Sequence, residues 1–358
     1  MEPGGAERVG LNLANWFAEK GFRSDLVLVQ RRGSLIGQIT SGVRVIDLAQ
    51  TRAARAILPF RRYVLNERPN AVLAINFEVN VAAGLALIGV KPKPTLIMSV
   101  HCPPSFYFRL ASWPWVKAMM IASKFACRYS DYLVAVSGGV ALEVRSLGWL
   151  PSERIILIPN PVLDGRLAVS AKSKSEHPWL GSHEIPVVIS AGRLTPEKNF
   201  GLLIEAFQRV LADRAARLLI LGEGACRTEL EGKIAQAGLA DAVELFGYAS
   251  NPYPYIREAD VFALSSDYEG FGNVLVEAMA VGTPIVSTDA PHGPREILEN
   301  GKWGRLVSTG NADALAAAIL ESLDAPRGSA QARVREFTVE ASGGRYLELM
   351  TGRPVRLT

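Results

Sequence analysis

Cysteine is scarce in this sequence, and its few copies are far apart. The 358 residues include three cysteines, Cys102, Cys127 and Cys226, and no pair of them has a CxxC spacing. Disulfide frameworks and cysteine-ligated zinc sites need paired or closely spaced cysteines. The sequence therefore predicts a protein of a reducing compartment such as the cytoplasm, without a disulfide framework or a zinc site.

Long apolar runs are also lacking. The longest, Val79–Val90, is interrupted by Asn80 and ends before Lys91, whereas a membrane-spanning helix needs about 20 apolar residues. The opening residues, MEPGGAERVG, have no apolar core of the kind found in signal peptides. We therefore expect a soluble or peripheral protein.

Neither sign of charge dominates. Lysine and arginine number 39 against 35 aspartates and glutamates, which leaves a net charge of +4. Hydrophobic residues make up 49% and charged residues 21%, as in an ordinary globular chain. The small excess fits a protein that meets anionic ligands or an anionic membrane, and we expect no nucleic-acid partner.

Short apolar runs alternate with helical patterns in two series. Runs such as LVLV, AVLAI and LIMSV are apolar on both faces, which is typical of parallel strands covered by helices on each side. The first series predicts strands at Asp25–Val29, Val43–Leu48, Ala71–Phe77, Thr95–Val100, Tyr132–Val136 and Ile155–Ile158. The second predicts strands at Val187–Ala191, Arg217–Leu221, Val243–Phe246, Val261–Leu264, Pro284–Ser287 and Arg305–Val307.

A polar segment separates the two series. Residues 169–186 are rich in Ser, Lys, His and Pro and are predicted to be a linker. The predicted domains are then 1–168 and 187–335, and a helix in 336–358 is expected to return to the N-terminal domain. Two doubly wound α/β domains would face each other across a cleft, and ligands of such folds bind beyond the carboxyl ends of the strands.

The sequence predicts an N-terminal domain without its first strand. GGAER resembles the loop after the first strand of a Rossmann-type domain, yet only Met1, Glu2 and Pro3 precede it. That strand is normally central, so its loss would leave both neighbours unpaired, at about 1–3 kcal/mol for each buried unpaired group. We expect the natural start to lie upstream, where in-frame codons would encode an apolar strand.

The stretch Asp260–Glu277, DVFALSSDYEGFGNVLVE, predicts a buried strand, a polar loop and a helix opened by glycines. Gly270 and Gly272 would leave the amides of Phe271, Gly272 and Asn273 available to a phosphate or to sugar hydroxyls. The helix start is therefore a candidate anion site.

Two glutamates flank this helix start. Glu269 is placed to bind the hydroxyls of a sugar, and Glu277 to accept two hydrogen bonds from a ribose. The competing interpretation is a solvated helix face. Glu277 argues against it, because it lies within the apolar run VLVEAMAVG, where a carboxylate needs a partner.

Arg193 and Lys198 lie between a strand and a helix in ISAGRLTPEKNF. An arginine fork can bind a diphosphate, and a lysine adds a point charge. A solvated basic loop is the alternative, and the two residues alone do not decide between them.

Two glycine turns and one histidine have weaker signals. Gly4 and Gly5 open the first helix, either as an anion site or as a plain turn. Gly222 and Gly224 are interpreted as a tight turn with little ligand role. His101 ends the strand TLIMSV, and this strand-end position favours a functional role over a structural one.

Taken together, EGFGNVLVEAMAVGTPIVST, AGRLTPEKNF, LLILGEG, PGGAER and IPNPV occur in the order found in one family. The chain resembles the retaining glycosyltransferases of family four, which have the GT-B fold of two facing Rossmann-like domains. The resemblance covers nearly the whole chain.

The resemblance implies a role for each C-terminal candidate. The family's E-x7-E motif falls on Glu269 and Glu277, so Glu277 would bind the donor ribose and Glu269 the donor sugar. Arg193 and Lys198 would take the diphosphate. The segment Ala290–Leu298, APHGPREIL, resembles bacterial members that extend lipid-linked oligosaccharides or surface polysaccharides, and it places Arg295 near the donor.

It also implies roles in the N-terminal domain. His101 matches the histidine that touches the donor sugar near the reaction centre, and Gly4 and Gly5 match a loop near the phosphates and the acceptor. Asn160 matches a cleft residue. Since no Asp-x-Asp motif occurs, we expect no metal and no cofactor other than the nucleotide-sugar substrate.

The implied reaction moves a hexose or N-acetylhexosamine from a UDP-sugar to a glycolipid or polysaccharide acceptor, with retention of configuration. Two alternatives stay open: a GT-B nucleotide-sugar epimerase, which needs no acceptor, and a non-catalytic sugar-nucleotide-binding module. Ser105–Arg128 and Arg52–Arg62 mix apolar and basic residues. They are either ordinary core helices with snorkelling cations or surfaces for the cytoplasmic face of an anionic membrane.

Overall fold

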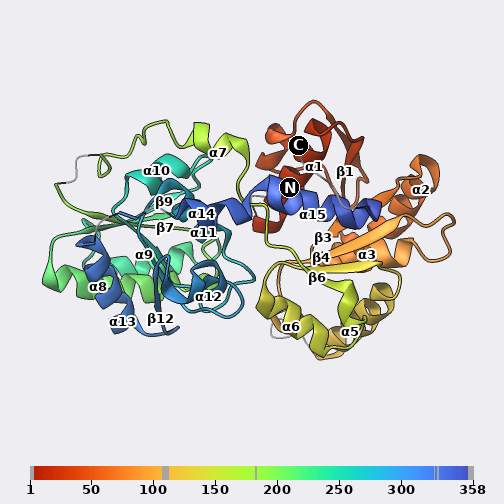
Figure 1. Cartoon of the computed structure of the whole chain (residues 1–358). Coiled ribbons are helices and arrows are strands. Elements are labelled where there is room, and N and C mark those ends of the chain that lie inside the picture. The colour runs from red at the N-terminus through yellow and green to blue at the C-terminus, as the bar shows by residue number, and fades with distance from the viewer. Residues whose placement is uncertain (1–3, 107–112, 182–183, 326, 329, 354–358) are drawn as a thin grey trace. The chain divides into compact units, whose positions relative to one another are not determined.

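The computed structural model describes residues 4–106, 113–181, 184–325, 327–328 and 330–353. The chain forms two compact units (Figure 1). Unit 1 comprises Met1–Val162 and Glu336–Thr358, and unit 2 comprises Leu163–Arg335. Residues 169–186, predicted as a linker, lie in unit 2, where the buried His177 packs its ring against Trp179.

Unit 1 is an α/β unit built on parallel strands. Its strands are β1 (Ser24–Leu28), β2 (Val43–Asp47), β3 (Ala71–Ile75), β4 (Thr95–Val100), β5 (Tyr132–Ala135) and β6 (Ile155–Leu157). Its α-helices are α1 (Gly5–Glu19), α2 (Ile57–Glu67), α3 (Phe77–Ala86), α5 (Trp113–Cys127), α6 (Gly138–Ser146) and α15 (Val339–Thr351). Short 3₁₀ turns lie at Ser34–Gln38, Ala53–Ala56 and Ser152–Arg154, and a further one at Arg335–Phe337 begins on the last residue of unit 2.

The strands of unit 1 fall into two separate sheets. One holds β1 and β2, and the other has the order β3-β4-β5-β6. Helix α1 contacts both β1 and β3. Among the described residues no strand pairs with the second edge of β1 or of β3.

Helices cover the larger sheet of unit 1 on both faces. Successive side chains of a strand point to opposite sides, so alternate residues of β4 pack against different helices. On β4, Leu96, Met98 and Val100 belong to a core shared with α2, α3, α5 and α6. Ile97 belongs to a second core, shared with α1 and with Tyr346 of α15. The C-terminal helix is therefore part of the core of unit 1.

Unit 2 is a second α/β unit with one parallel sheet. Its strands are β7 (Val187–Ala191), β8 (Arg217–Leu221), β9 (Val243–Gly247), β10 (Val261–Leu264), β11 (Ile285–Thr288) and β12 (Arg305–Val307). Its α-helices are α7 (Gly165–Ser170), α8 (Phe200–Asp213), α9 (Arg227–Gln236), α10 (Tyr253–Glu258), α11 (Asn273–Val281), α12 (Pro294–Ile297), α13 (Ala312–Leu323) and α14 (Gln331–Val334). 3₁₀ turns lie at Pro196–Lys198 and Glu299–Gly301.

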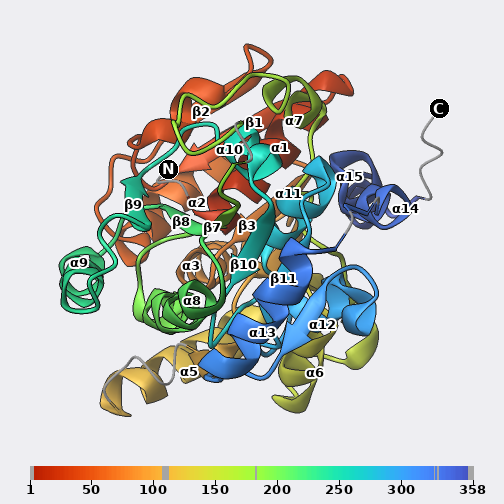
Figure 2. The same cartoon turned by 90° about the vertical axis from the view of Figure 1, so that its left-hand side faces the viewer.

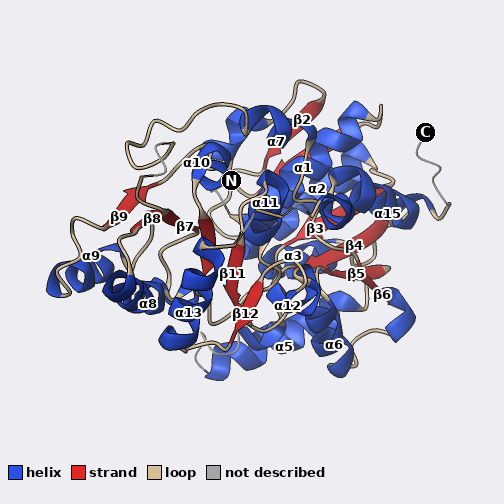
Figure 3. Ribbon diagram, turned by 60° about the vertical axis from the view of Figure 1, so that its left-hand side comes forward, coloured by secondary structure: helices blue, strands red, loops and turns tan. Residues whose placement is uncertain are grey.

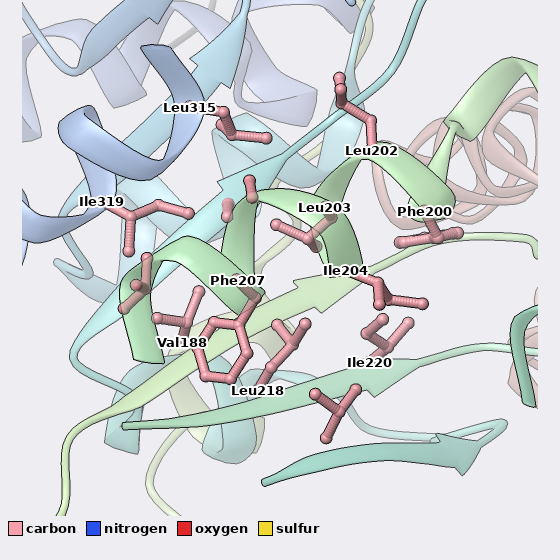
Figure 4. Close-up of a cluster of buried hydrophobic side chains, with 14 of the residues drawn as sticks. Val188, Phe200, Leu202, Leu203, Ile204, Phe207, Leu218, Ile220, Leu315 and Ile319 are labelled. Atoms are coloured by element: carbon pink, nitrogen blue, oxygen red, sulfur yellow. The ribbon is translucent and has the colours of Figure 1, made fainter. Parts of the chain in front are cut away.

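The sheet order, β9-β8-β7-β10-β11-β12, is that of a Rossmann-type domain (Figure 3). Helices α8 and α13 lie side by side on it (Figure 2). Their apolar faces meet strand residues such as Val188 and Leu218 in a fully buried cluster that includes Phe207 and Ile319 (Figure 4). The predicted parallel strands of both series are confirmed, at nearly the predicted bounds.

Candidate active site

The predicted donor residues of unit 2 gather where the strand order reverses. Strands β7 and β10 are neighbours in the sheet, although two strands and three helices separate them in the sequence. In open α/β sheets, ligands bind beyond the carboxyl ends of the strands at such a switch point. The loop after β7 carries Arg193 and Lys198, and the loop after β10 carries Glu269.

An ion pair joins these two loops. Nζ of Lys198 donates to Oε1 of Glu269 at 2.5 Å. The hydroxyl of Ser266 donates to the same oxygen at 2.7 Å. Glu269 is only 6% exposed, so its charge is held by these two partners away from bulk water.

Further bonds lock the loops together, and they involve residues that the sequence did not single out. Asn199 donates to Oδ2 of Asp267 at 2.9 Å, and Ser265 donates to the carbonyl of Lys198 at 2.9 Å. Thr288 of β11 donates to the carbonyl of Ser266 at 2.6 Å. The position of Glu269 therefore depends on three strands.

Helix α11 begins directly after Glu269 and the glycine loop. Gly272 is its N-cap residue, with a left-handed φ of 100° that favours glycine, and Asn273 is its first residue. Gly270 and Phe271 are buried. Glu277 lies one turn into the helix and is 8% exposed. The structure thus confirms the predicted strand, loop and helix, and shows that Glu277 does not lie on a solvated face.

A glycine turn holds the loop of Arg193 in place. A Cβ atom at Gly222 would lie 1.8 Å from the carbonyl oxygen of Gly192, and one at Gly224 would lie 2.3 Å from that of Leu194. The carbonyl of Glu223, in the same turn, accepts a hydrogen bond from the amide of Leu194. The side chain of Arg193 is exposed. The turn therefore serves the site indirectly, by supporting the neighbouring loop.

Arg295 lies on α12 and forms an ion pair with Asp289. Asp289 follows β11, and the loop from Asp289 to Arg295 packs against the glycine loop before α11. The approach is close, since a Cβ at Gly293 would lie 1.9 Å from the carbonyl oxygen of Phe271. Arg295 is thus a neighbour of the loop that precedes α11.

In unit 1, His101 directly follows β4 and is 9% exposed. Its Nε2 lies 3.0 Å from Oγ of Ser99, and its Nδ1 is buried without a hydrogen-bond partner among the described residues. Burial lowers the pKa of His101 to about 4, so the ring is neutral at pH 7.

Gly4 and Gly5 open α1, Gly4 as the N-cap residue. A carboxylate already lies there: a Cβ at Gly4 would be 2.2 Å from Oε2 of Glu7, whose other oxygen accepts from Asn76 at 3.0 Å. An anion at this helix start would have to compete with Glu7, whose orientation the sequence does not indicate.

Asn160 follows β6 and is buried. Its loop is held on both sides, since Asn12 of α1 donates to the carbonyl of Pro161 at 3.0 Å and Ser342 of α15 donates to that of Pro159 at 2.8 Å. The described residues contain no group of three or more His, Cys, Asp or Glu side chains arranged to hold a metal ion.

Two Rossmann-like α/β units, with the Lys198–Glu269 ion pair at the switch point of the second, are the architecture of a glycosyltransferase of the GT-B class. Two family models agree: glycosyl transferases group 1 matches residues 174–338, and glycosyltransferase family 4 matches residues 3–164. The chain belongs to glycosyltransferase family 4, and it is a transferase.

Two similar proteins are named bacterial glycosyltransferases. The lipopolysaccharide core biosynthesis glycosyltransferase LpsE of Rhizobium meliloti is 28% identical over 98% of this chain and 97% of its own length. An undecaprenol-diphosphate-linked glycan 4-alpha-N-acetylgalactosaminyltransferase of Campylobacter jejuni is 39% identical over 36% of this chain and 34% of its own length.

Among solved structures, Anabaena Alr3699/HepE in complex with UDP has a TM-score of 0.73 at 19% identity. The match covers 98% of this chain and 97% of that one. It supports the GT-B fold.

Proposed function

We propose that this chain is a retaining glycosyltransferase that moves a hexose or N-acetylhexosamine from a UDP-sugar to a lipid-linked oligosaccharide or polysaccharide. The observation that carries the proposal is the Lys198–Glu269 pair at the switch point, beside the start of α11. It places a cation, a carboxylate and helix amides within one loop cluster, which are the groups that a nucleoside diphosphate and a sugar require.

In this proposal each group acts on one part of the donor. Arg193, Lys198 and the amides at the start of α11 bind the diphosphate and stabilise its charge as the sugar leaves. Glu277 binds the ribose, Glu269 binds hydroxyls of the sugar, and no metal or cofactor takes part. In unit 1, His101 donates a hydrogen bond to the sugar.

Relatives support the choice of substrates. LpsE is named for lipopolysaccharide core biosynthesis, and the Campylobacter relative is named for an acceptor on undecaprenol diphosphate. The Anabaena protein has been solved with UDP and with UDP-glucose. These names favour a UDP-sugar donor and a glycan acceptor that is attached to a lipid.

The test is mass spectrometry of products from a panel of UDP-sugars with a polyprenyl-diphosphate-linked sugar as acceptor. We expect a product one sugar heavier, UDP release that depends on the acceptor, and an α-linkage from an α-linked donor. UDP release without acceptor, together with an isomerised sugar, would instead indicate an epimerase. Full turnover by Glu269→Ala would contradict the assignment of this site.

We further propose that unit 1 contacts the cytoplasmic face of an anionic membrane. On α5, Ile121 and Phe125 are 71% and 44% exposed, next to the exposed cations Lys117, Lys124 and Arg128. Exposed apolar side chains beside cations are typical of interfacial helices. Residues 107–112 of the predicted segment Ser105–Arg128 lie outside the described residues, and among those described no helix is both long and apolar enough to span a bilayer.

The second basic segment has the same character. Arg55, Leu58, Arg62 and Leu65 are all exposed, at the spacing of one helix face, around the start and along the length of α2. Both helices contact α3, which lies between them on one face of the sheet.

Binding to vesicles that contain anionic lipid tests this part. Changing Lys117, Lys124 and Arg128 to glutamate should abolish binding. The control changes Lys172, Lys174 and Lys302, three exposed lysines of unit 2, to glutamate, which alters the net charge equally. Equal binding by the two triple variants would contradict the proposal.

A further inference from the structure

A chain of three buried hydrogen-bonding side chains links the C-terminal helix to His101. Oγ of Ser99 lies 3.0 Å from Nε2 of His101 and 3.2 Å from the hydroxyl oxygen of Tyr346. Ser99 is fully buried on β4, and Tyr346 is fully buried on α15, 247 positions later in the chain.

The alternation of side chains on β4 explains why these residues meet. Leu96, Met98 and Val100 point into the core beneath α3 and α5. The intervening Ile97 points to the opposite face, where Tyr346 lies. Ser99 lies two positions after Ile97 and His101 two positions further, so both share the face toward α15.

The two tautomers of His101 give two sets of proton positions in this chain. In the first, Tyr346 donates to Ser99, Ser99 donates to Nε2 of His101, and the ring proton is on Nδ1. In the second, Nε2 donates to Ser99 and Ser99 donates to Tyr346. The phenol proton of Tyr346 then has no acceptor among the described residues. If Tyr346 instead donates to Ser99 alongside Nε2, the proton of Ser99 is the one left without an acceptor. The first arrangement leaves one buried polar group unpaired, the Nδ1–H of His101, whereas an Nε2–H ring leaves two, the unprotonated Nδ1 and one hydroxyl proton, so the first arrangement is favoured.

We infer that Tyr346 and Ser99 are positioning residues that hold His101 in its Nδ1–H tautomer, with Nδ1 ready to donate to a sugar oxygen. The contact with the sugar rests on the proposed function, whereas the tautomer does not. Nδ1 is the buried ring atom that lacks a partner among the described residues, as expected of a donor reserved for a ligand.

Two pKa shifts fit this arrangement. Burial lowers the pKa of His101 to about 4, which leaves the ring neutral, and burial raises the pKa of Tyr346 to about 12, which keeps the phenol protonated. A charged imidazole or a phenolate would break the order of donors and acceptors.

The tautomer is tested by NMR on full-length protein carrying ¹⁵N-labelled histidine, without any substrate. The signals of His101 are identified by their loss in His101→Gln. At pH 7 we expect a protonated Nδ1 and an unprotonated Nε2. Tyr346→Phe and Ser99→Ala should each populate the Nε2–H form. A dominant Nε2–H form in the unmodified protein, or unchanged signals in both variants, would overturn the inference.

Matched controls separate positioning from loss of folding. Tyr63→Phe also removes a phenol hydroxyl from unit 1, one that donates to Asp25 at 2.8 Å. Ser130→Ala removes a fully buried hydroxyl that donates to the carbonyl of Cys127 at 2.8 Å. Neither should alter the ring signals of His101.

Kinetics test the consequence for transfer. Tyr346→Phe and Ser99→Ala should each lower kcat/KM about tenfold, the effect of one misdirected hydrogen bond. The double variant should be no worse than Ser99→Ala, because both changes act through the same ring nitrogen. If the tautomer is as inferred but these variants retain full kcat/KM, the positioning role is overturned. If the unmodified protein transfers no sugar from any donor, the proposed function fails and the NMR result still decides the tautomer.

Discussion

Lys198 and Glu269 lie 71 positions apart in the sequence, yet the ammonium group of one donates to the carboxylate of the other at 2.5 Å. The proposal assigns the cation to the diphosphate and the carboxylate to the sugar. The two groups therefore neutralise each other in the absence of a donor. A diphosphate that draws Lys198 toward itself would release Glu269 to accept hydrogen bonds from the sugar.

This relationship predicts that removing the charge of Glu269 strengthens the binding of UDP but slows turnover of the UDP-sugar. Glu269→Gln should bind UDP several-fold more tightly than the unmodified enzyme, because Lys198 loses a competing partner. Its kcat with UDP-sugar should fall by roughly 10²-fold or more, because a charged contact with the sugar is lost. Calorimetry with UDP and steady-state kinetics measure the two effects. Glu205→Gln, which removes an exposed carboxylate paired with Arg209, is the control. Weaker UDP binding by Glu269→Gln would contradict the coupling.

Asn199 is expected to matter for donor binding more than for stability. It caps α8 through the amide of Leu202 and also donates to Asp267 across the site. Its φ is 43°, so Asn199→Gly keeps the backbone while removing both contacts. Because Gly replaces an N-cap asparagine at a cost of only a few tenths of a kcal/mol, unfolding should change little.

The KM for UDP-sugar should rise about tenfold in Asn199→Gly, since a loosened loop no longer holds Lys198 in place. Asn311→Gly is the matched control, because Asn311 caps α13 through the amide of Ala314. An equal rise in KM for both variants would show that the effect arises from helix capping alone.

Replacing Gly224, in the turn beside the Arg193 loop, and Gly232, in a helix of the same unit, by alanine should change the free energy of unfolding in opposite directions. Gly224→Ala should lower the free energy of unfolding by about 1–3 kcal/mol, because the new Cβ would collide with the carbonyl of Leu194. Gly232 lies inside α9, and a Cβ there would meet no atom within 4 Å. Gly232→Ala should raise the free energy of unfolding by about 0.5–1 kcal/mol. Urea denaturation at one temperature compares them, and equal effects would refute the close approach.

The low pKa of the buried His101 predicts that the folded protein loses stability in acid. Its pKa is about 4 in the folded protein against an ordinary value of 6.5. Between pH 6.5 and 4 the unfolded chain therefore takes up a proton that the folded protein does not. Stability is full above pH 6.5 and falls by roughly 3 kcal/mol by pH 4 from this group alone.

His101→Gln should lose correspondingly less stability over the same range, as measured by urea denaturation at pH 7 and pH 4.5. His292→Gln is the control, since this histidine is only partly buried and lies in unit 2. A pH dependence in His101→Gln identical to that of the unmodified protein would contradict the burial effect.

The sequence predicted the strands well, because parallel strands covered on both faces leave continuous apolar runs such as LIMSV. It also indicated Glu269 and Lys198, which the structure brings together, and His101, because charged and titratable side chains are unusual at strand ends. It could not indicate Ser266, Asn199 or Thr288. Serine, threonine and asparagine are common in loops, and nothing in their spacing shows which ones hold the candidate loops in place.

Contacts between residues far apart in the sequence could not be predicted either. Tyr346 meets Ser99 across 247 positions, and no local pattern indicates that contact. The sequence does not indicate the role of Glu7 at the start of α1, because its position depends on the conformation of its own side chain and on Asn76. The sequence predicts the turn at Gly222 and Gly224, but the reason for its glycines lies in a neighbouring loop.

The way the chain enters and leaves unit 2 has a practical consequence. Unit 2 is one continuous stretch, whereas unit 1 is assembled from two pieces whose ends meet, since the amide of Val162 donates to the carbonyl of Phe337 at 3.0 Å. In gene-design terms, unit 2 is an insertion. A short linker from Val162 to Phe337 would excise it and keep Tyr346 attached to the half of the enzyme that holds His101.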